Sequence, residues 1–253
     1  MKPPYPYSKL SKAPIVEAVV ELKVRLTGSV DLTRLGAFRQ ELSERFPFSR
    51  DMQVFQARLN LDPEKGPQQS FEAGTLGVRL ESEDKRWVIQ ARGDGVAISR
   101  LAQYDRWESL REQAEVVWPA YVRALEPAAV VRLGVRYINR IELSADTIDF
   151  DKVLTKGPTI PNDLPQALTE FYSRIVIPMS DERATLVIVQ SFDPAPPIPS
   201  GSLPGVVLDI DAFSEEPHEV GSAEIWGTLD RLRQVKNKAF FNSLTADTLE
   251  SLK

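Results

Sequence analysis

The chain has 253 residues, of which 42% are hydrophobic and 26% charged, and its formal net charge is −5. This composition is that of a globular protein large enough to bury a substantial core. The negative charge argues against general nucleic-acid binding, although it is compatible with a local basic groove. Without cysteine, disulfides and thiolate metal sites are excluded, and a single histidine excludes sites with two imidazoles. We expect a cytoplasmic protein that does not span a membrane.

The first half of the chain begins with a Pro- and Tyr-rich stretch, residues 1–13, which we expect to form an extended arm. From Pro14, apolar and charged residues alternate as in a half-buried strand that runs to Leu26. Asp31 is the predicted N-cap of a helix over residues 32–46. Further strands are predicted at 53–61, 71–81, 86–92 and 96–101, with a loop at 63–69 and a second helix over 105–125.

The second half opens with another alternating strand, Ala129–Leu143, which resembles the first one in pattern. Residues 144–165 are irregular, apart from a short helix predicted near 149–154. Strands are then predicted at 171–178, 183–192 and 206–213. A long helix is predicted from about Pro217, and Thr245 is the predicted cap of a last helix over 246–252.

Together these elements predict an α+β fold built from two pseudo-repeated halves, residues 14–127 and 128–253. Each half follows the order β-α-β-β-β-(β)-α, with antiparallel strands and a long helix packed on a sheet face. The pattern does not decide whether the two halves share one sheet or form two.

Several stretches resemble an uncharacterised, sporadically distributed bacterial protein family of about this length. They are Ala13–Glu21, Ser99–Glu108, Leu133–Ile141, Leu208–Phe213 and Ala239–Thr245. The resemblance spans nearly the whole chain and implies a single full-length unit. It transfers no activity and no catalytic residue. The family's patchy distribution is typical of mobile or defence-type systems, such as toxin–antitoxin pairs.

Three arginines form the best candidate binding site. Arg132, Arg136 and Arg140 share one face of the strand 129–143, and successive members are about 13 Å apart by the rise of a strand. Such a face suits a phosphate or carboxylate ligand. The alternative is a solvated sheet face on which Asp209 and Asp211 neutralise the arginines.

Further residues extend this candidate ligand site. Arg174 lies near the three arginines if its strand pairs close to theirs. Asn139 falls on the apolar face between Tyr137 and Ile141, where an unpaired amide is costly. Asn139 therefore either faces a cavity, which Tyr137 would also line, or is satisfied by backbone groups at a bulge or sheet end. Tyr137 has a second interpretation as a core residue.

Two other groups of residues suggest different functions. Asp209 and Asp211, two residues apart on a strand, are weak candidates for a Mg²⁺ site, but no further nuclease motif accompanies them. Trp226, Phe240 and Phe241 suggest a surface that docks another element or subunit. We predict no cofactor and no catalytic residue.

Three functions follow from this sequence. The leading hypothesis is a non-catalytic protein that acts through a protein partner or as a homodimer, as the neutralising or sensing component of a two-component system. The second is a binder of a phosphate-bearing ligand or nucleic acid through Arg132, Arg136 and Arg140. The third is a metal-dependent hydrolase centred on Asp209 and Asp211.

Overall fold

The fold is α+β, as predicted, and its centre is one antiparallel sheet of nine strands in the order β2-β3-β4-β5-β1-β6-β9-β8-β7. The computed structural model describes residues 10–28, 31–62, 66–143, 149–194 and 203–253. Residues 14–127 and 128–253 meet within the sheet, because β1 (Ile15–Arg25) pairs with β6 (Ala129–Glu142). The chain therefore builds one continuous sheet.

The remaining elements follow the predicted order along the chain. The strands are β2 (Phe48–Asp62), β3 (Gly66–Glu81), β4 (Trp87–Arg92), β5 (Gly95–Leu101), β7 (Tyr172–Met179), β8 (Ala184–Asp193) and β9 (Gly205–Ser214). The α-helices are α1 (Leu35–Glu41), α2 (Trp107–Leu125), α3 (Glu224–Ser243) and α4 (Ala246–Ser251). Two short 3-10 turns, η1 (Leu32–Arg34) and η2 (Phe150–Lys152), complete the elements found in the described residues.

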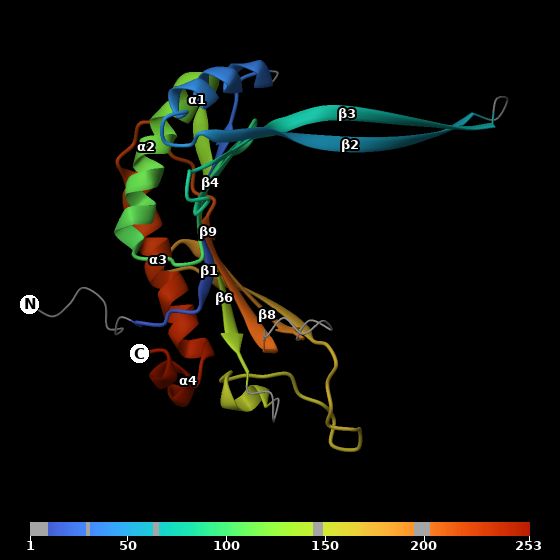
Figure 1. Ribbon diagram of the computed structural model, residues 1–253, viewed down its shortest axis with the longest axis vertical. Helices are drawn as coiled ribbons and strands as arrows, with labels where there is room; N and C mark the ends of the chain where they lie inside the picture. The colour runs from blue at the N-terminus through green and yellow to red at the C-terminus, as the bar shows by residue number, and fades with distance from the viewer. Residues whose placement is uncertain (1–9, 29–30, 63–65, 144–148, 195–202) are drawn as a thin grey trace, which may run out of the picture.

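The helices lie on one side of the sheet, as Figure 1 shows. Helix α2 contacts β5 and β1, and α3 contacts β6 and β9. The alternation of side chains along β1 explains why the helices cover this face of the sheet. Val20 and Leu22 are fully buried beneath the helix layer, whereas Glu21 between them points to the opposite face. We call the side covered by the helices the helix face and the opposite side the open face.

Strands β2 and β3 extend beyond the sheet as a two-stranded ribbon. Strand β3 pairs with β4 only from Gly77 to Glu81, and the rest of it pairs with β2 alone. Figure 1 shows the ribbon projecting from the sheet on the side away from α2 and α3. The predicted loop at 63–69 was too long, because Gly66 to Gln69 already pair with β2.

The segments at 32–41 and 246–251 begin at side-chain caps, whereas α3 begins after a segment that pairs with a distant strand. Asp31 accepts a hydrogen bond from the Thr33 amide at 3.0 Å, and Thr245 accepts one from the Thr248 amide at 3.3 Å, so both predicted caps are confirmed. The prediction that the long helix starts near Pro217 was wrong, since α3 begins at Glu224. His218 exchanges two backbone hydrogen bonds with Val130, which holds this segment extended.

The start of the described chain lies against its end. The Lys12 amide donates to the Leu252 carbonyl at 3.0 Å, and Leu10 packs against the core. The rest of the predicted arm, residues 1–9, lies outside the described residues. In the described part of the chain, no helix is long and apolar enough to cross a membrane.

Candidate functional site

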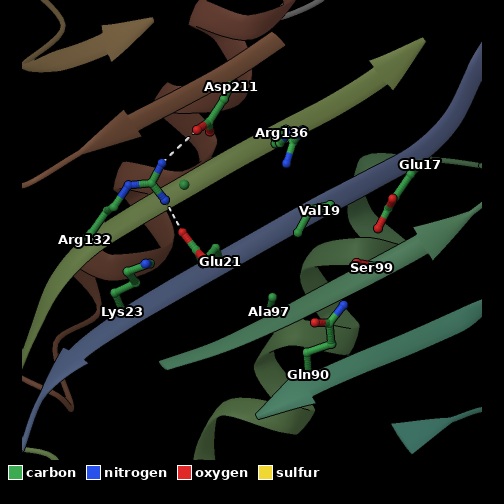
Figure 2. Close-up of a pocket in the computed structure, with 11 residues that line it drawn as sticks. Glu17, Val19, Glu21, Lys23, Gln90, Ala97, Ser99, Arg132, Arg136 and Asp211 are labelled. Atoms are coloured by element: carbon green, nitrogen blue, oxygen red, sulfur yellow. Dashed lines mark hydrogen bonds and ion pairs between the residues drawn. The ribbon is translucent and has the colours of Figure 1, made fainter. Parts of the chain in front are cut away.

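The candidate site is a polar hollow of about 450 Å³ in the middle of the open face. Five neighbouring strands, β4, β5, β1, β6 and β9, supply its lining (Figure 2). Small residues and the amide of Gln90 form part of the lining, and three acidic and three basic side chains complete it. These residues are Val19, Ala97, Ser99, Gly134, Gln90, Glu17, Glu21, Asp211, Lys23, Arg132 and Arg136. The formal charges of this lining cancel.

Arg132 is bound between two carboxylates (Figure 2). Its guanidinium donates to Asp211 at 2.8 Å and to Glu21 on the other side, and it lies 4.2 Å from the centre of the Phe213 ring. The Arg132 side chain is only 18% exposed. Burial raises the pKa of Asp211, although the neighbouring Arg132 opposes that shift. The arginine is therefore an internal counter-ion of the sheet.

Gly134 makes room for this arrangement. It lies across from Glu21 on β1 and Phe213 on β9. A Cβ atom at this position would lie 2.8 Å from Nη1 of Arg132, closer than such atoms pack. The missing side chain at Gly134 thus lets the guanidinium of Arg132 lie across the strand towards Glu21.

We call Arg132, Arg136 and Arg140 the arginine ladder; its other two members also have acidic partners. Arg136 donates to both carboxylate oxygens of Asp209, at 2.8 and 2.6 Å, and these hydrogen bonds raise its pKa. Arg140 donates to Asp193 at 2.6 Å and to the Leu203 carbonyl at 2.6 Å. The expected neutralisation by Asp209 and Asp211 is therefore present. Arg136 nevertheless remains 49% exposed and can contact a second molecule.

The sheet separates the other predicted ligand residues from this ladder. Arg174 lies on β7, and two strands, β9 and β8, separate it from β6, so three strand spacings of about 4.8 Å lie between. Tyr137 and Asn139 lie on β6 itself but on the helix face, where they are 2% and 1% exposed. A ligand on the open face can contact the arginines but not Tyr137 or Asn139.

Asn139 is satisfied by backbone groups at a β-bulge. Its amide donates to the Leu208 carbonyl at 2.9 Å and to the Tyr137 carbonyl at 3.3 Å. The bulge is the register shift between Ile15 and Glu17, where β1 pairs with this part of β6. Of the two interpretations of Asn139, the structure thus favours the structural one.

Lys236, which the sequence analysis did not single out, lies buried beneath α3 on the helix face. Its side-chain nitrogen is 3.5 Å from the centre of the Tyr137 ring, and the residue is 6% exposed. Burial, and secondarily the charge of Arg233, lowers the pKa of Lys236 to about 7. The hydroxyl of Tyr137 is hydrogen-bonded to that of Tyr104 at 2.7 Å. The sequence does contain a signal for the burial of Lys236: in a helix of 3.6 residues per turn, it falls on the same apolar side as Leu232 and next to Val235.

The metal and docking candidates also have defined places. Both carboxylates of the Asp209 and Asp211 pair bind arginines, and the described residues contain no group of three or more His, Cys, Asp or Glu side chains placed to hold a metal. Phe240 is 6% exposed and packs in the core, where its ring meets that of Phe241 edge-on. Phe241 and Trp226 are partly buried against the same core.

Comparison of the chain with protein-family models and with curated proteins finds no match. Arg132 and Arg136 are both paired with carboxylates, and the exposed side of Arg136 and the small residues of the hollow are what a partner could contact. Such a surface is suited to recognition by complementary polar groups.

Proposed function

We propose that this protein is a non-catalytic binding protein that holds a protein partner on its open face. The observation that carries the proposal is the one-sided cover of the sheet: the helices lie on one face, and the ribbon projects beside the other (Figure 1). In the described part of the chain, no helix covers the open face of the nine-stranded sheet, and a face of this size offers a broad surface for association.

The charge pattern of the open face supports a protein partner over a polyanion. Phosphate binding needs an excess of positive charge, whereas the hollow has equal numbers of acidic and basic side chains. The least exposed of the three arginines, Arg132, is already bound by Glu21 and Asp211. A protein surface of mixed charge complements such a pattern without displacing these ion pairs.

The ribbon supports the same proposal. An isolated two-stranded hairpin is marginally stable in water, so a ribbon of this length gains from contact with another molecule. In the described part of the chain, β2 pairs only with β3, and β3 pairs with no second strand before Gly77. The ribbon therefore offers two unpaired strand edges on which a partner can dock.

We also propose a biological setting. The resemblance to the bacterial family favours a neutralising or sensing role in a two-component system, and the lack of cysteine is compatible with the reducing cytoplasm. The partner is then a second protein or a second copy of the chain. We further propose that residues 14–127 and 128–253 are related halves. Two strand orders, β1-β5-β4-β3 and β6-β9-β8-β7, support this.

The test is native mass spectrometry of the protein purified gently from its own host. The wild type is compared with Arg136→Glu, which reverses the charge of an exposed side chain on the open face. The matched control is Arg123→Glu, the same change at a 61% exposed arginine on α2. A ribbon variant, in which residues 53–76 are replaced by Asn-Gly, completes the set.

The expected result is a stoichiometric protein partner that Arg136→Glu and the ribbon variant lose and Arg123→Glu keeps. A bound oligonucleotide or phosphate compound without a protein partner would replace the proposal with the arginine-ligand alternative. A bare monomer in every sample would overturn the proposal. Loss of folding in Arg136→Glu, followed by circular dichroism, would assign the Arg136–Asp209 pair to stability instead.

A further inference from the structure

A second surface, on the helix face, is open and apolar. It is a groove of about 480 Å³ between α3 and the strands β7 and β8. We call it the helix-face groove and define it by Ile175, Ile177, Ile188, Val235 and Ala239. Ile175 is 49% exposed although it pairs with Ile188 of β8 and lies beside Ile177 on the same face of β7. The proposed partner surface lies on the opposite face, so this groove is a separate site.

The first half of the chain shows what such a groove accommodates. Counted outward from the central pair β1 and β6, β3 and β7 occupy equivalent third positions. In the first half, helix α1 packs against β3 and α2 and buries Leu35 and Phe38. In the second half, β7, β8 and α3 line the groove at the corresponding place.

The second half supplies no such helix of its own among the described residues. Helix α1 lies between β1 and β2 in the chain, and the corresponding segment lies between β6 and β7. In its described part, that segment contains only the short turn η2 (Phe150–Lys152). Its residues Thr155 to Pro158 border the groove but leave it open. Among the residues that the structure describes, none of the second half fills the position that α1 occupies in the first.

The charge around the groove restricts what can bind there. Of the side chains that line it, the only charged ones are Lys156 and Lys238, and both are exposed. An occupant with acidic residues beside its apolar surface would complement these two lysines, and one with basic residues would be repelled.

We propose that the helix-face groove binds an amphipathic helix of a partner protein, with an apolar ridge spaced like that of α1 and acidic residues beside the ridge. The ridge of the first half is Leu35 and Phe38 of α1 and Leu42 and Phe46 of the turn that follows it, all buried, with spacings of three or four residues. A helix of this kind lays its apolar side against the groove, and its acidic side chains reach Lys156 and Lys238.

The probe is a fluorescein-labelled, hydrocarbon-stapled peptide of residues 32–47 carrying Arg34→Glu, Arg39→Glu and Arg45→Glu. Fluorescence anisotropy measures its binding to the full chain. A second stapled peptide keeps the three arginines and the apolar ridge but carries Glu41→Lys and Glu44→Lys. At low salt we expect the acidic peptide to bind at least about tenfold more tightly than the basic one.

Two adjacent residues of β7 provide matched protein variants. Ile175 and Val176 are 49% and 48% exposed, but only Ile175 lines the groove. Ile175→Asp should weaken binding of the acidic peptide at least about tenfold, and Val176→Asp should change it less than about twofold. If Ile175→Asp fails to fold by circular dichroism, Lys238→Glu replaces it, and the preference for the acidic peptide should then disappear.

Three results would overturn the proposal: no binding of the acidic peptide to the wild type, equal loss in Ile175→Asp and Val176→Asp, or equal binding of the two peptides. A fourth is a wild-type dimer, seen by sedimentation, that Ile175→Asp dissociates, because a second copy would then fill the groove. The ribbon variant and Arg136→Glu should bind the acidic peptide normally, which separates this test from that of the open face.

Discussion

At the scale of single residues, the two faces of the sheet hold cationic side chains in different surroundings. On the open face, Arg132 and Arg136 are paired with acidic side chains close to solvent. On the helix face, Lys236 lies over the ring of Tyr137 and is almost fully buried. Among the described residues no carboxylate pairs with Lys236, and burial alone disfavours the charged form of an amine, so this lysine should link stability to pH.

Lys236→Met tests that link. In the unfolded chain a lysine has its ordinary pKa of about 10.4, whereas the pKa of Lys236 in the fold is lowered to about 7. Between these values the unfolded state binds a proton that the folded state lacks, so the free energy of unfolding rises with pH, by at most about 1.4 kcal/mol per pH unit. In Lys236→Met this rise should disappear, and the variant should be more stable than the wild type near pH 7.

Urea denaturation followed by circular dichroism between about pH 6 and 9 measures the effect. The control is Lys238→Met, an exposed lysine on the same helix, which should keep the wild-type slope. Equal slopes in the wild type and Lys236→Met would show that this amine keeps its charge in the fold.

Arg132→Gln tests the counter-ion role of the open-face arginine. Its removal leaves Glu21 and Asp211, both largely buried, without a common cation, and should cost about 1–3 kcal/mol of unfolding free energy. Arg132→Gln/Asp211→Asn should recover part of the loss, because one carboxylate is removed with the cation. Arg34→Gln, which breaks an exposed pair with Glu126, should cost less than about 1 kcal/mol. A loss at Arg132 no larger than at Arg34 would contradict the interpretation.

At the scale of elements, the ribbon and the sheet should be energetically separate. Strand β3 leaves its partner β4 at Gly77, and positions beyond it pair only with β2. Replacement of residues 53–76 by Asn-Gly, whose turn suits a two-residue hairpin, should therefore change the unfolding free energy by less than about 1 kcal/mol.

By contrast, Gly77→Ala should be severely destabilising, since its Cβ would lie 2.1 Å from the Ala91 carbonyl oxygen.

Urea unfolding of the two variants measures this difference. A ribbon variant that loses several kcal/mol would show that the ribbon packs on the body of the protein in solution. A stable ribbon variant that also loses its partner would assign the ribbon to recognition.

The elements that the sequence predicts correctly are those with local causes. The alternation of β1 and the caps Asp31 and Thr245 depend on neighbouring residues alone. The start of α3 was missed because the pairing of His218 with Val130 joins residues far apart in the sequence. The length of the ribbon was missed for a similar reason, since a polar strand end such as Gln68 and Gln69 has no apolar pattern.

The arginine ladder and its partners Asp209 and Asp211 were predictable, because alternation along a strand fixes which residues share a face. Tyr137 and Arg136 are adjacent on one strand, so they must face opposite sides of the sheet. The neutral balance of the hollow also depends on Glu21 of β1, whose position beside Arg132 requires the pairing of β1 with β6. No local pattern in the sequence specifies that pairing.

At the scale of the whole molecule, the two predicted halves are joined in both layers. In the sheet, β1 and β6 pair along most of their length. In the helix layer, Asp230 of α3 accepts hydrogen bonds at 2.7 Å from both Trp107 and Arg111 of α2. The indole of Trp118 also donates to the Val220 carbonyl at 3.2 Å. Neither half can unfold without exposing the apolar side of the other's central strand.

We therefore expect the chain to unfold in a single cooperative transition, although residues 14–127 and 128–253 each have the size of a domain. Calorimetry should give equal calorimetric and van't Hoff enthalpies. Trp226 is the only tryptophan after residue 127, so a chain with its other three tryptophans changed to Phe reports the second half, and Trp226→Phe reports the first. Each midpoint is compared with the circular-dichroism midpoint of the same variant. Two separate midpoints in one variant would show that the β1–β6 pair does not couple the halves.

Asp230→Ala should lower the common midpoint without splitting it, because the sheet still joins the halves after the helix contact is lost.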